Sequence, residues 1–287
     1  YGFGGILADD MGLGKTLQMI AYLDSERKEG RTNIVVTPAS LLLNWEDEIH
    51  KFSSDLKCLA IYGTKNERNE FIQSAKDYDV IITSYDYLRR DIELYEEINF
   101  YTIVLDEAQY IKNQKTKNAL CVKKLKGEHR FALTGTPIEN SLAELWSIFD
   151  FLMPHYLYNY HYFAAQYEKP IVKFQDEQRQ TRLQNMTSPF LLRRNKAVVL
   201  KELPPKIEKT LTFTFNEQEK NLYYANLAQI NKDLAQKLKL ETNQRFEILA
   251  MLTKLRQICL DPRLVYDEIE ESSSKIKGCI ELLHSLK

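Results

Sequence analysis

A glycine-rich segment near the start of the chain has the residue types of a phosphate-binding loop. Gly12–Thr16, which reads GLGKT, lies between the apolar run Gly5–Ala8 and a helical pattern. Glycines let successive backbone N–H groups turn toward a polyphosphate, and the helix N-terminus adds a favourable dipole. Lys15 would reach the β and γ phosphates, and the Thr16 hydroxyl would bind Mg²⁺. The residues expected to contact the nucleotide are Asp10, Met11, Gly12, Leu13, Gly14, Lys15 and Thr16.

The loop departs at one position from the pattern G-x-x-x-x-G-K-[ST], because Asp9 stands where the first glycine would be. A glycine-rich turn with an exposed lysine is the alternative interpretation of this segment. A dinucleotide-binding loop is disfavoured, since G-x-G-x-x-G requires glycine at the position that Leu17 occupies.

A pair of carboxylates follows the apolar strand expected over Thr102–Leu105. Such a pair suits a nucleotide hydrolase, in which Asp106 holds Mg²⁺ and Glu107 positions or deprotonates the attacking water. An Asp-Glu pair after a strand is also a common start of a loop, and the phosphate loop upstream is what favours the catalytic interpretation. Both segments would lie at the carboxyl ends of parallel strands, where open α/β sheets bind ligands. The two together predict ATP or GTP binding.

Short β-branched runs alternate with helical patterns from residue 4 to about 152. This alternation is typical of a parallel sheet covered by helices. The expected strands are Gly5–Ala8, Asn33–Thr37, Cys58–Tyr62, Val80–Thr83, Thr102–Leu105 and Phe131–Leu133.

Two helices are expected beside this sheet. The first begins near Lys15, has Gly30 to stop it, and buries Met19, Ile20 and Leu23. Ser40 is expected to cap the second helix, whose apolar residues step by three and four along one face. Those residues are Leu42, Trp45, Ile49 and Phe52.

Long amphipathic patterns replace the strands after Pro154. Two apolar stripes separated by a break at Glu241–Gln244 predict an antiparallel helical hairpin. The stripes are Leu227, Ile230, Leu234 and Leu238, then Leu249, Leu252, Leu255 and Cys259. Alternation at Leu211, Phe213 and Phe215 predicts one half-buried strand. The acidic, serine-rich stretch Glu268–Ser274 reads as a linker before a last helix with Ile276, Ile280 and Leu283.

Composition limits the class of protein. The chain has 287 residues, 39 Lys plus Arg against 40 Asp plus Glu, and 44% hydrophobic residues, as a soluble globular protein of about two structural units does. The net charge of −1 gives no global argument for nucleic acid. Apolar runs such as Met19–Leu23 are five residues long, against the roughly 20 that a membrane-spanning helix needs. The 4 cysteines form no C-x-x-C pair, so buried or incidental thiols are expected.

Three segments resemble motifs I, II and III of the Swi/Snf-like ATPases, a branch of the superfamily two helicases. They are Ile6–Thr16, Asp106–Gln109 and Leu133–Pro137. The similarity covers nearly the whole chain, and the family's phosphate loop carries an acidic residue where Asp9 stands. The further similar segments are Val35–Leu41 with Asn44 and Trp45, Thr83–Tyr85, Ile111–Asn113, Glu139–Trp146, Leu191–Arg194, Leu203–Lys206 and Leu255–Cys259.

The resemblance implies an α/β fold, a RecA-like P-loop parallel sheet with helices on both faces, followed by a mainly helical protrusion. It assigns residues 1–154 to RecA-like ATP-binding lobe 1, 155–267 to the helical protrusion and inter-lobe segment, and 268–287 to a linker and the start of lobe 2. The family's arginine fingers would follow Lys287, in the second RecA-like lobe, and its adenine-recognising motif would precede Tyr1. Because the chain also opens on Tyr1 rather than Met, we expect a fragment that hydrolyses ATP poorly alone.

The resemblance also implies cofactors, partners and residue roles. ATP and Mg²⁺ would drive translocation along double-stranded DNA, which moves or displaces DNA-bound proteins. Catalysis falls to Glu107, Gln109 and Lys15, and metal binding to Thr16 and Asp106. The residues implied to couple ATP to motion are Thr134, Gly135 and Thr136. Those implied to contact DNA are Thr37, Ser40, Thr83, Ser84, Lys112 and Asn113.

Several alternatives stay open at this stage. The basic stretch Lys112–Arg130 fits DNA phosphates or a solvated helix face. Arg193 and Arg194 fit phosphate binding, coupling of the protrusion to the lobes, or structural ion pairs. A strand-separating helicase of the same superfamily and a nucleotide-binding scaffold without turnover are the competing functions. No membrane partner is expected, and the location is bacterial cytoplasm at the nucleoid, or the nucleus if the source is eukaryotic.

Overall fold

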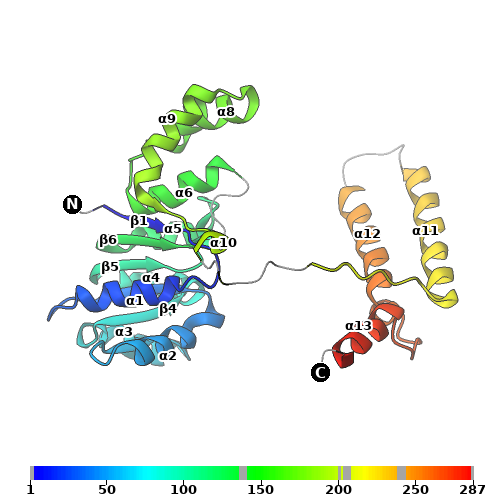
Figure 1. The fold of residues 1–287 in the computed structure, drawn as a ribbon, viewed down its shortest axis with the longest axis horizontal. Coiled ribbons are helices and arrows are strands. Elements are labelled where there is room, and N and C mark those ends of the chain that lie inside the picture. Colours follow the sequence, from blue (N-terminus) through cyan, green and yellow to red (C-terminus); the bar gives the residue numbers. More distant parts are fainter. Residues whose placement is uncertain (1–2, 136–140, 200–201, 203–207, 238–243, 286–287) are drawn as a thin grey trace. The chain divides into compact units, whose positions relative to one another are not determined.

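The computed structural model describes residues 3–135, 141–199, 202, 208–237 and 244–285 (Figure 1). The chain divides into two compact units, Tyr1–Pro204 and Pro205–Lys287. Each unit is considered by itself below.

Unit 1 is built on a sheet of seven strands in the order β3-β4-β2-β5-β6-β1-β7, with every pair parallel. The strands are β1 Gly5–Leu7, β2 Asn33–Thr37, β3 Cys58–Ala60, β4 Val80–Ser84, β5 Asn99–Leu105, β6 Lys126–Leu133 and β7 Leu191–Leu192. The six strands predicted from the sequence are confirmed, although β5 and β6 begin earlier and β1 and β3 end earlier than expected. The strand β7 was not predicted.

Helices cover both faces of this sheet, as the predicted RecA-like α/β fold requires. Val35 on β2 packs in the apolar cluster with α1 (Lys15–Ser25) and α2 (Leu42–Phe52). Its neighbours Ile34 and Val36 point to the opposite cluster, because side chains alternate along a strand. The helices of that second cluster are α3 Lys65–Gln73, α4 Tyr85–Tyr95, α5 Lys117–Lys124 and α6 Leu142–Leu152. Every residue of β2 and β4 is buried, which explains why their apolar runs, Ile34–Val36 and Val80–Ile82, do not alternate with polar residues.

Two details of the first helices differ from the sequence prediction. Helix α1 buries Met19, Ile20 and Leu23 as expected but ends at Ser25, whereas Gly30 lies in the following turn with φ 79°. The prediction that Ser40 caps α2 is wrong, because Ser40 lies exposed within a 3₁₀ turn over Ala39–Leu41. That turn leads directly into α2, and the Leu41 N–H donates to Pro38 O at 2.9 Å. The chain therefore enters the helix without a side-chain cap.

Helices α7 Tyr160–Phe163, α8 Lys169–Phe174 and α9 Glu177–Thr187 pack beside α6. Helix α10 (Lys196–Val199) lies instead at the phosphate loop, where the Lys196 N–H donates to Asp10 Oδ2. Phe163, Tyr167 and Leu183 join the same apolar cluster as Phe149 of α6.

Unit 2 contains α11 (Glu217–Lys237), α12 (Gln244–Leu260) and α13 (Ser274–Ser285). Helices α11 and α12 lie side by side in opposite directions, so the predicted hairpin is confirmed; most of its expected break falls outside the described residues (Figure 1). Among the hairpin side chains that the structure describes, the buried apolar ones are Ile230, Leu255 and Ile258. Leu249 and Leu252, from the second apolar stripe, are more than half exposed.

The strand predicted around Phe213 is also wrong. Residues 208–216 are described but contain no strand, and Leu211, Phe213 and Phe215 are all exposed. An alternating pattern becomes a strand only where a second strand supplies backbone partners. None of the described helices is long and apolar enough to cross a membrane.

Candidate active site

The phosphate loop joins β1 to α1 at the carboxyl edge of the sheet. Gly12 and Gly14 have φ 85° and 71°, which glycine adopts without the strain that a side chain would bring. Gly14 is the N-cap residue of α1, so the helix N-terminus opens onto the loop. The Lys15 ammonium donates to Asp9 O at 2.7 Å and to Asp10 O at 3.4 Å. Backbone N–H groups and an ammonium thus converge where a polyphosphate would bind.

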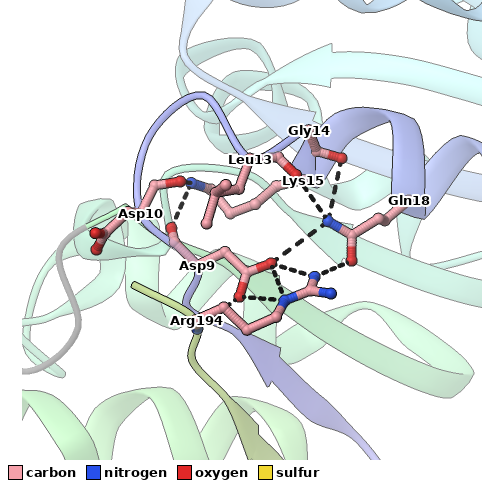
Figure 2. A network of polar contacts seen from close by, with 7 residues as sticks. All are labelled: Asp9, Asp10, Leu13, Gly14, Lys15, Gln18 and Arg194. Atoms are coloured by element: carbon pink, nitrogen blue, oxygen red, sulfur yellow. Dashed lines mark hydrogen bonds and ion pairs between the residues drawn. The ribbon is translucent and has the colours of Figure 1, made fainter. Parts of the chain in front are cut away.

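Asp9, the departure from the common loop pattern, is a fully buried ion-pair residue (Figure 2). Its carboxylate accepts hydrogen bonds from the Arg194 guanidinium, from the Arg194 N–H at 2.8 Å and from Gln18 Nε2 at 3.4 Å. Burial opposes ionisation, but these bonds outweigh it and hold the pKa of Asp9 below its usual value. An acid therefore replaces the first glycine because the fold supplies an arginine for it.

Asp106 lies directly after β5 and is held by three donors. Its Oδ2 accepts from Trp45 Nε1 at 2.8 Å and Thr37 Oγ1 at 3.1 Å, and its Oδ1 accepts from the Glu107 N–H at 2.9 Å. Asp106 is 8% exposed. Burial, and next to it the charge of Glu107, raise the pKa of Asp106, while the bonds from Trp45 and Thr37 lower it; the net shift is upward.

The Asp106 carboxylate and its surroundings are suited to bind a magnesium ion. Within the described part of the chain, this buried carboxylate has hydrogen bonds but no cationic partner. A divalent cation would stabilise the charged form of a carboxylate whose pKa burial raises. Mg²⁺ usually takes one or two protein oxygens and completes its shell with water and phosphate. Asp106 and the Thr16 hydroxyl would hold it, and no cluster of three metal-ligating residues is found among the described residues.

Glu107 adopts a left-handed backbone conformation, with φ 49° and ψ 55°. For a residue other than glycine this conformation is strained, and such residues concentrate at functional sites. Its Oε2 accepts from Gln109 Nε2 at 2.7 Å, and Gln109 Oε1 accepts from Thr134 Oγ1 at 3.2 Å. One chain of hydrogen bonds therefore links the expected catalytic carboxylate to the segment that follows β6.

The sheet register brings these segments to one edge. Ile6 of β1 pairs with Ala132 of β6, and Ala132 pairs with Leu105 of β5. The phosphate loop, Thr134 and Asp106 consequently follow neighbouring strands, roughly 5 Å apart from one strand to the next.

A close approach also joins the phosphate loop to the segment after β6. A Cβ placed on Gly135 would lie 2.9 Å from Met11 Cγ and 3.7 Å from Lys15 Nζ. Gly135 therefore lies against the exposed side chain of Met11 and close to the Lys15 ammonium. Thr136, the third expected coupling residue, lies outside the described residues.

The residues implied to contact DNA fall into two groups. Thr37, Thr83 and Ser84 are fully buried, and their hydroxyls bond to Asp106, Tyr95 and the Tyr87 N–H. The side chains of this first group support strands and helix ends. The second group is exposed and comprises Ser40, Lys112 and Asn113.

The basic stretch Lys112–Arg130 is largely paired within the protein. Lys112, Lys123 and Lys124 form ion pairs with Glu144, Asp150 and Glu96. Arg130 donates to two backbone carbonyls. The remaining lysines of the stretch, Lys115, Lys117 and Lys126, are exposed.

Sequence comparison identifies the family of this fold and site. The profile of the SNF2-related domain matches residues 1–264. The chain belongs to the SNF2 family of ATPase motor domains. The resemblance to Swi/Snf-like ATPases that the motifs indicated is thereby confirmed, together with its RecA-like fold.

Individual relatives support the same family. The chain is 42% identical over 288 residues to an uncharacterized ATP-dependent helicase of Mycoplasma genitalium, covering 98% of this chain and 27% of the relative. It is 40% identical over 250 residues to the human TATA-binding protein-associated factor 172, covering 78% of this chain and 14% of that protein. The chain thus spans about a quarter or less of the length of these relatives.

A solved structure also matches. The SWI2/SNF2 ATPase core of Sulfolobus solfataricus in complex with dsDNA superimposes with a TM-score of 0.65 at 37% identity, covering 99% of this SNF2 chain and 60% of that chain. This likeness confirms the α/β architecture predicted from the sequence.

Three site residues escaped the sequence interpretation. Trp45 was assigned to the buried face of α2 and to a segment similar to the family, without a role at the site, yet its indole N–H donates to Asp106 Oδ2. Tyr85 stacks on Tyr110 at 5.1 Å and donates to Asp106 O at 2.8 Å, and Gln18 reaches the phosphate loop from α1. An indole N–H that must find a partner when buried was the one available signal for Trp45.

Proposed function

We propose that this SNF2 chain is the N-terminal motor lobe of an ATP-dependent double-stranded DNA translocase that remodels or displaces DNA-bound proteins. The observation that carries the proposal is the meeting of the phosphate loop, Asp106 and the Glu107–Gln109–Thr134 hydrogen bonds at one sheet edge. This arrangement can bind a nucleoside triphosphate, position water and transmit the result to the segment after β6.

The residues of the candidate active site have separate roles in this proposal. Lys15 and the loop N–H groups bind the β and γ phosphates, and Thr16 and Asp106 hold Mg²⁺, which supplies charge neutralisation at the phosphates when bound. Glu107 accepts a proton from, or orients, the attacking water. Gln109 is hydrogen-bonded to both Glu107 and Thr134. It contacts the γ-phosphate, and a shift of Gln109 when the phosphate is lost would move Thr134 and Gly135.

Duplex DNA is the proposed track. The supporting observations are that a similar SNF2 core is known in complex with dsDNA and that Ser40, Lys112 and Asn113 are exposed. Contacts from such residues would be mainly to phosphates, so binding would be independent of sequence and weakened by salt.

The proposed division of labour follows the family. Residues 1–154 form lobe 1, 155–267 the protrusion and inter-lobe segment, and 268–287 a linker with the start of lobe 2. A second RecA-like lobe beyond Lys287 would supply arginine fingers, which are worth roughly 10³–10⁵ in rate, so this chain alone would turn over slowly. The proposed location is the bacterial cytoplasm at the nucleoid, or the nucleus in a eukaryote.

Nucleotide binding by the 287-residue chain tests the first step. Titration with a fluorescent ATP analogue and Mg²⁺ should show binding that Lys15→Ala abolishes. Lys28→Ala is the matched control, because Lys28 is an exposed lysine beyond the far end of α1 and should bind as the wild type does. Equal affinity in Lys15→Ala and wild type would refute the phosphate-loop assignment.

Turnover tests the motor. In a protein extended through the second lobe, duplex DNA should stimulate phosphate release, and Glu107→Gln should remove the stimulation while sparing nucleotide binding. Duplex affinity measured at salt concentrations from about 50 to 200 mM should be lower for Lys112→Ala than for the wild type. Lys126→Ala, at the start of β6, should bind duplex DNA as the wild type does. Stimulated turnover that also separates the strands of a short duplex would favour the helicase alternative, and no turnover with DNA would favour the scaffold.

A further inference from the structure

The segment Leu191–Lys196, called the β7 segment below, is bound to the phosphate loop through its backbone. Strand β7 pairs with β1, and the Ala8 N–H donates to Leu192 O at 2.7 Å. Beyond the strand, the Asp10 N–H donates to Arg194 O at 3.1 Å. The entrance to the phosphate loop is therefore held by a segment 185 residues later in the sequence.

The side chain of Arg194 adds the strongest contact (Figure 2). Its Nε lies 3.1 and 3.0 Å from the two carboxylate oxygens of Asp9, and its Nη2 donates to Asp9 and to Gln18 Oε1. Gln18 Nε2 in turn donates to Leu13 O at 3.1 Å. One guanidinium thus connects the beginning of the loop with the first turn of α1.

The burial of Asp9 makes this arginine hard to replace. Asp9 is 0% exposed, so water cannot compensate its charge if Arg194 is lost. The backbone carbonyl of Asp9 is also the nearest acceptor of the Lys15 ammonium, at 2.7 Å. A shift of Asp9 would therefore displace Lys15, the residue that contacts the phosphates in the proposed function.

We propose that Arg194 is a positioning residue for nucleotide binding: acting through Asp9, it holds the phosphate loop and Lys15 in the arrangement that receives the polyphosphate. This inference rests on the nucleotide-binding function proposed above. Arg194 acts through its protein partners rather than on the phosphate, because its Nε and Nη2 are engaged by Asp9 and Gln18. By the reciprocity of linked equilibria, a nucleotide that orders the loop also stabilises the β7 segment.

Nucleotide affinity of variants of the 287-residue chain provides the first measurement. Arg194→Gln should weaken binding of a fluorescent ATP analogue with Mg²⁺ by roughly 10- to 100-fold, the range seen when a residue supporting a ligand contact is displaced. The affinity of Arg194→Lys should lie between those of the wild type and Arg194→Gln, because lysine keeps the charge but not the forked geometry of the guanidinium. Arg193→Gln, an exposed neighbour in the same segment, should bind as the wild type does.

A matched buried ion pair separates positioning from general destabilisation. Arg68 and Asp91 join α3 to α4 on the opposite sheet face from α1, with Nε–Oδ2 and Nη2–Oδ1 distances of 2.6 and 3.0 Å. Arg68→Gln should lower the melting temperature as Arg194→Gln does. At a temperature where circular dichroism shows every variant folded, Arg68→Gln should keep wild-type nucleotide affinity.

Hydrogen–deuterium exchange tests the reciprocal effect. In the wild type, ATP with Mg²⁺ should slow exchange of the Arg194 and Lys196 amides, which bond to the carboxylates of Asp9 and Asp10. In Arg194→Gln this nucleotide effect should be lost even at saturating ATP.

Three results would overturn the proposal: wild-type affinity in Arg194→Gln, an equal loss of affinity in Arg68→Gln, or no nucleotide-dependent protection of the β7 segment in the wild type. Lys15→Ala, measured in parallel, identifies where a failure lies. If Lys15→Ala loses binding while Arg194→Gln does not, the positioning role fails and the nucleotide site stands. If Lys15→Ala also binds normally, the proposed function fails with it.

Discussion

Replacing Trp45 with phenylalanine removes one of the two hydrogen bonds to Asp106 Oδ2 and leaves the one from Thr37 at 3.1 Å. Trp45 is 1% exposed, so water does not replace the lost donor. A hydrogen bond to a charged group contributes about 1.5–3 kcal/mol. The smaller ring adds about 1 kcal/mol of lost packing, a fraction of the 3–5 kcal/mol that truncation to alanine costs. We expect the free energy of unfolding to fall by about 2.5–4 kcal/mol.

Urea unfolding followed by circular dichroism measures this change, and a double-mutant cycle with Asp106→Asn isolates its charge-dependent part. The Trp45→Phe cost should be smaller when Asp106 is an amide, with a coupling of about 0.5–3 kcal/mol. Because the indole bond lowers the pKa of Asp106, Trp45→Phe raises that pKa further. The charge-dependent cost is therefore complete above the pKa of Asp106 in the variant and vanishes as pH falls below its wild-type pKa. Equal costs in both backgrounds would refute the reasoning.

Three further substitutions have defined expectations. Gly127→Ala should lower stability by about 1–3 kcal/mol in the same urea assay, because its Cβ would lie 2.6 Å from Ile103 Cδ1; a neutral effect would mean that β5 and β6 separate easily. The free energy of unfolding of Glu107→Gly should be about 1 kcal/mol higher than that of Glu107→Ala, because glycine adopts φ 49° without steric strain. Equal stabilities of the two variants would show that the backbone at this position is unstrained. Asp9 has a lowered pKa when folded, so its stabilising effect is full above the usual value of 3.8 and is lost as pH falls through the folded-state pKa. The stability gap between wild type and Asp9→Asn should narrow accordingly in acid, and a gap independent of pH would contradict the ion-pair account.

The sheet was predictable because its physical cause is local. In β2 and β4 every residue is buried, and burial on both faces accounts for the consecutive apolar residues Ile34–Val36 and Val80–Ile82 that the sequence displays. The phosphate loop was predictable for a similar reason, since Gly12 and Gly14 adopt backbone angles that few other residues tolerate.

Features that depend on distant partners were not predictable. Strand β7 has two residues and forms because β1 supplies its backbone hydrogen-bond partners. The partner of Asp9 could not be identified from the sequence, where Arg194 was compatible with phosphate binding, coupling or a structural ion pair. Conversely, the alternating apolar residues around Phe213 predict a strand that does not form, because no strand partner lies beside them among the described residues.

The position of β1 between β6 and β7 has a consequence for the order in which the molecule forms during translation. The phosphate loop is synthesised before its ion-pair partner, which follows 185 residues later, roughly 10–40 s at common rates of protein synthesis. Until then at least one edge of β1 is unpaired, and an unpaired edge can pair wrongly. Closing so long a loop is also slow. The nucleotide site would therefore be one of the last parts of unit 1 to mature, and a nascent chain halted before Leu191 would carry the whole Gly12–Thr16 motif without the contacts that shape it.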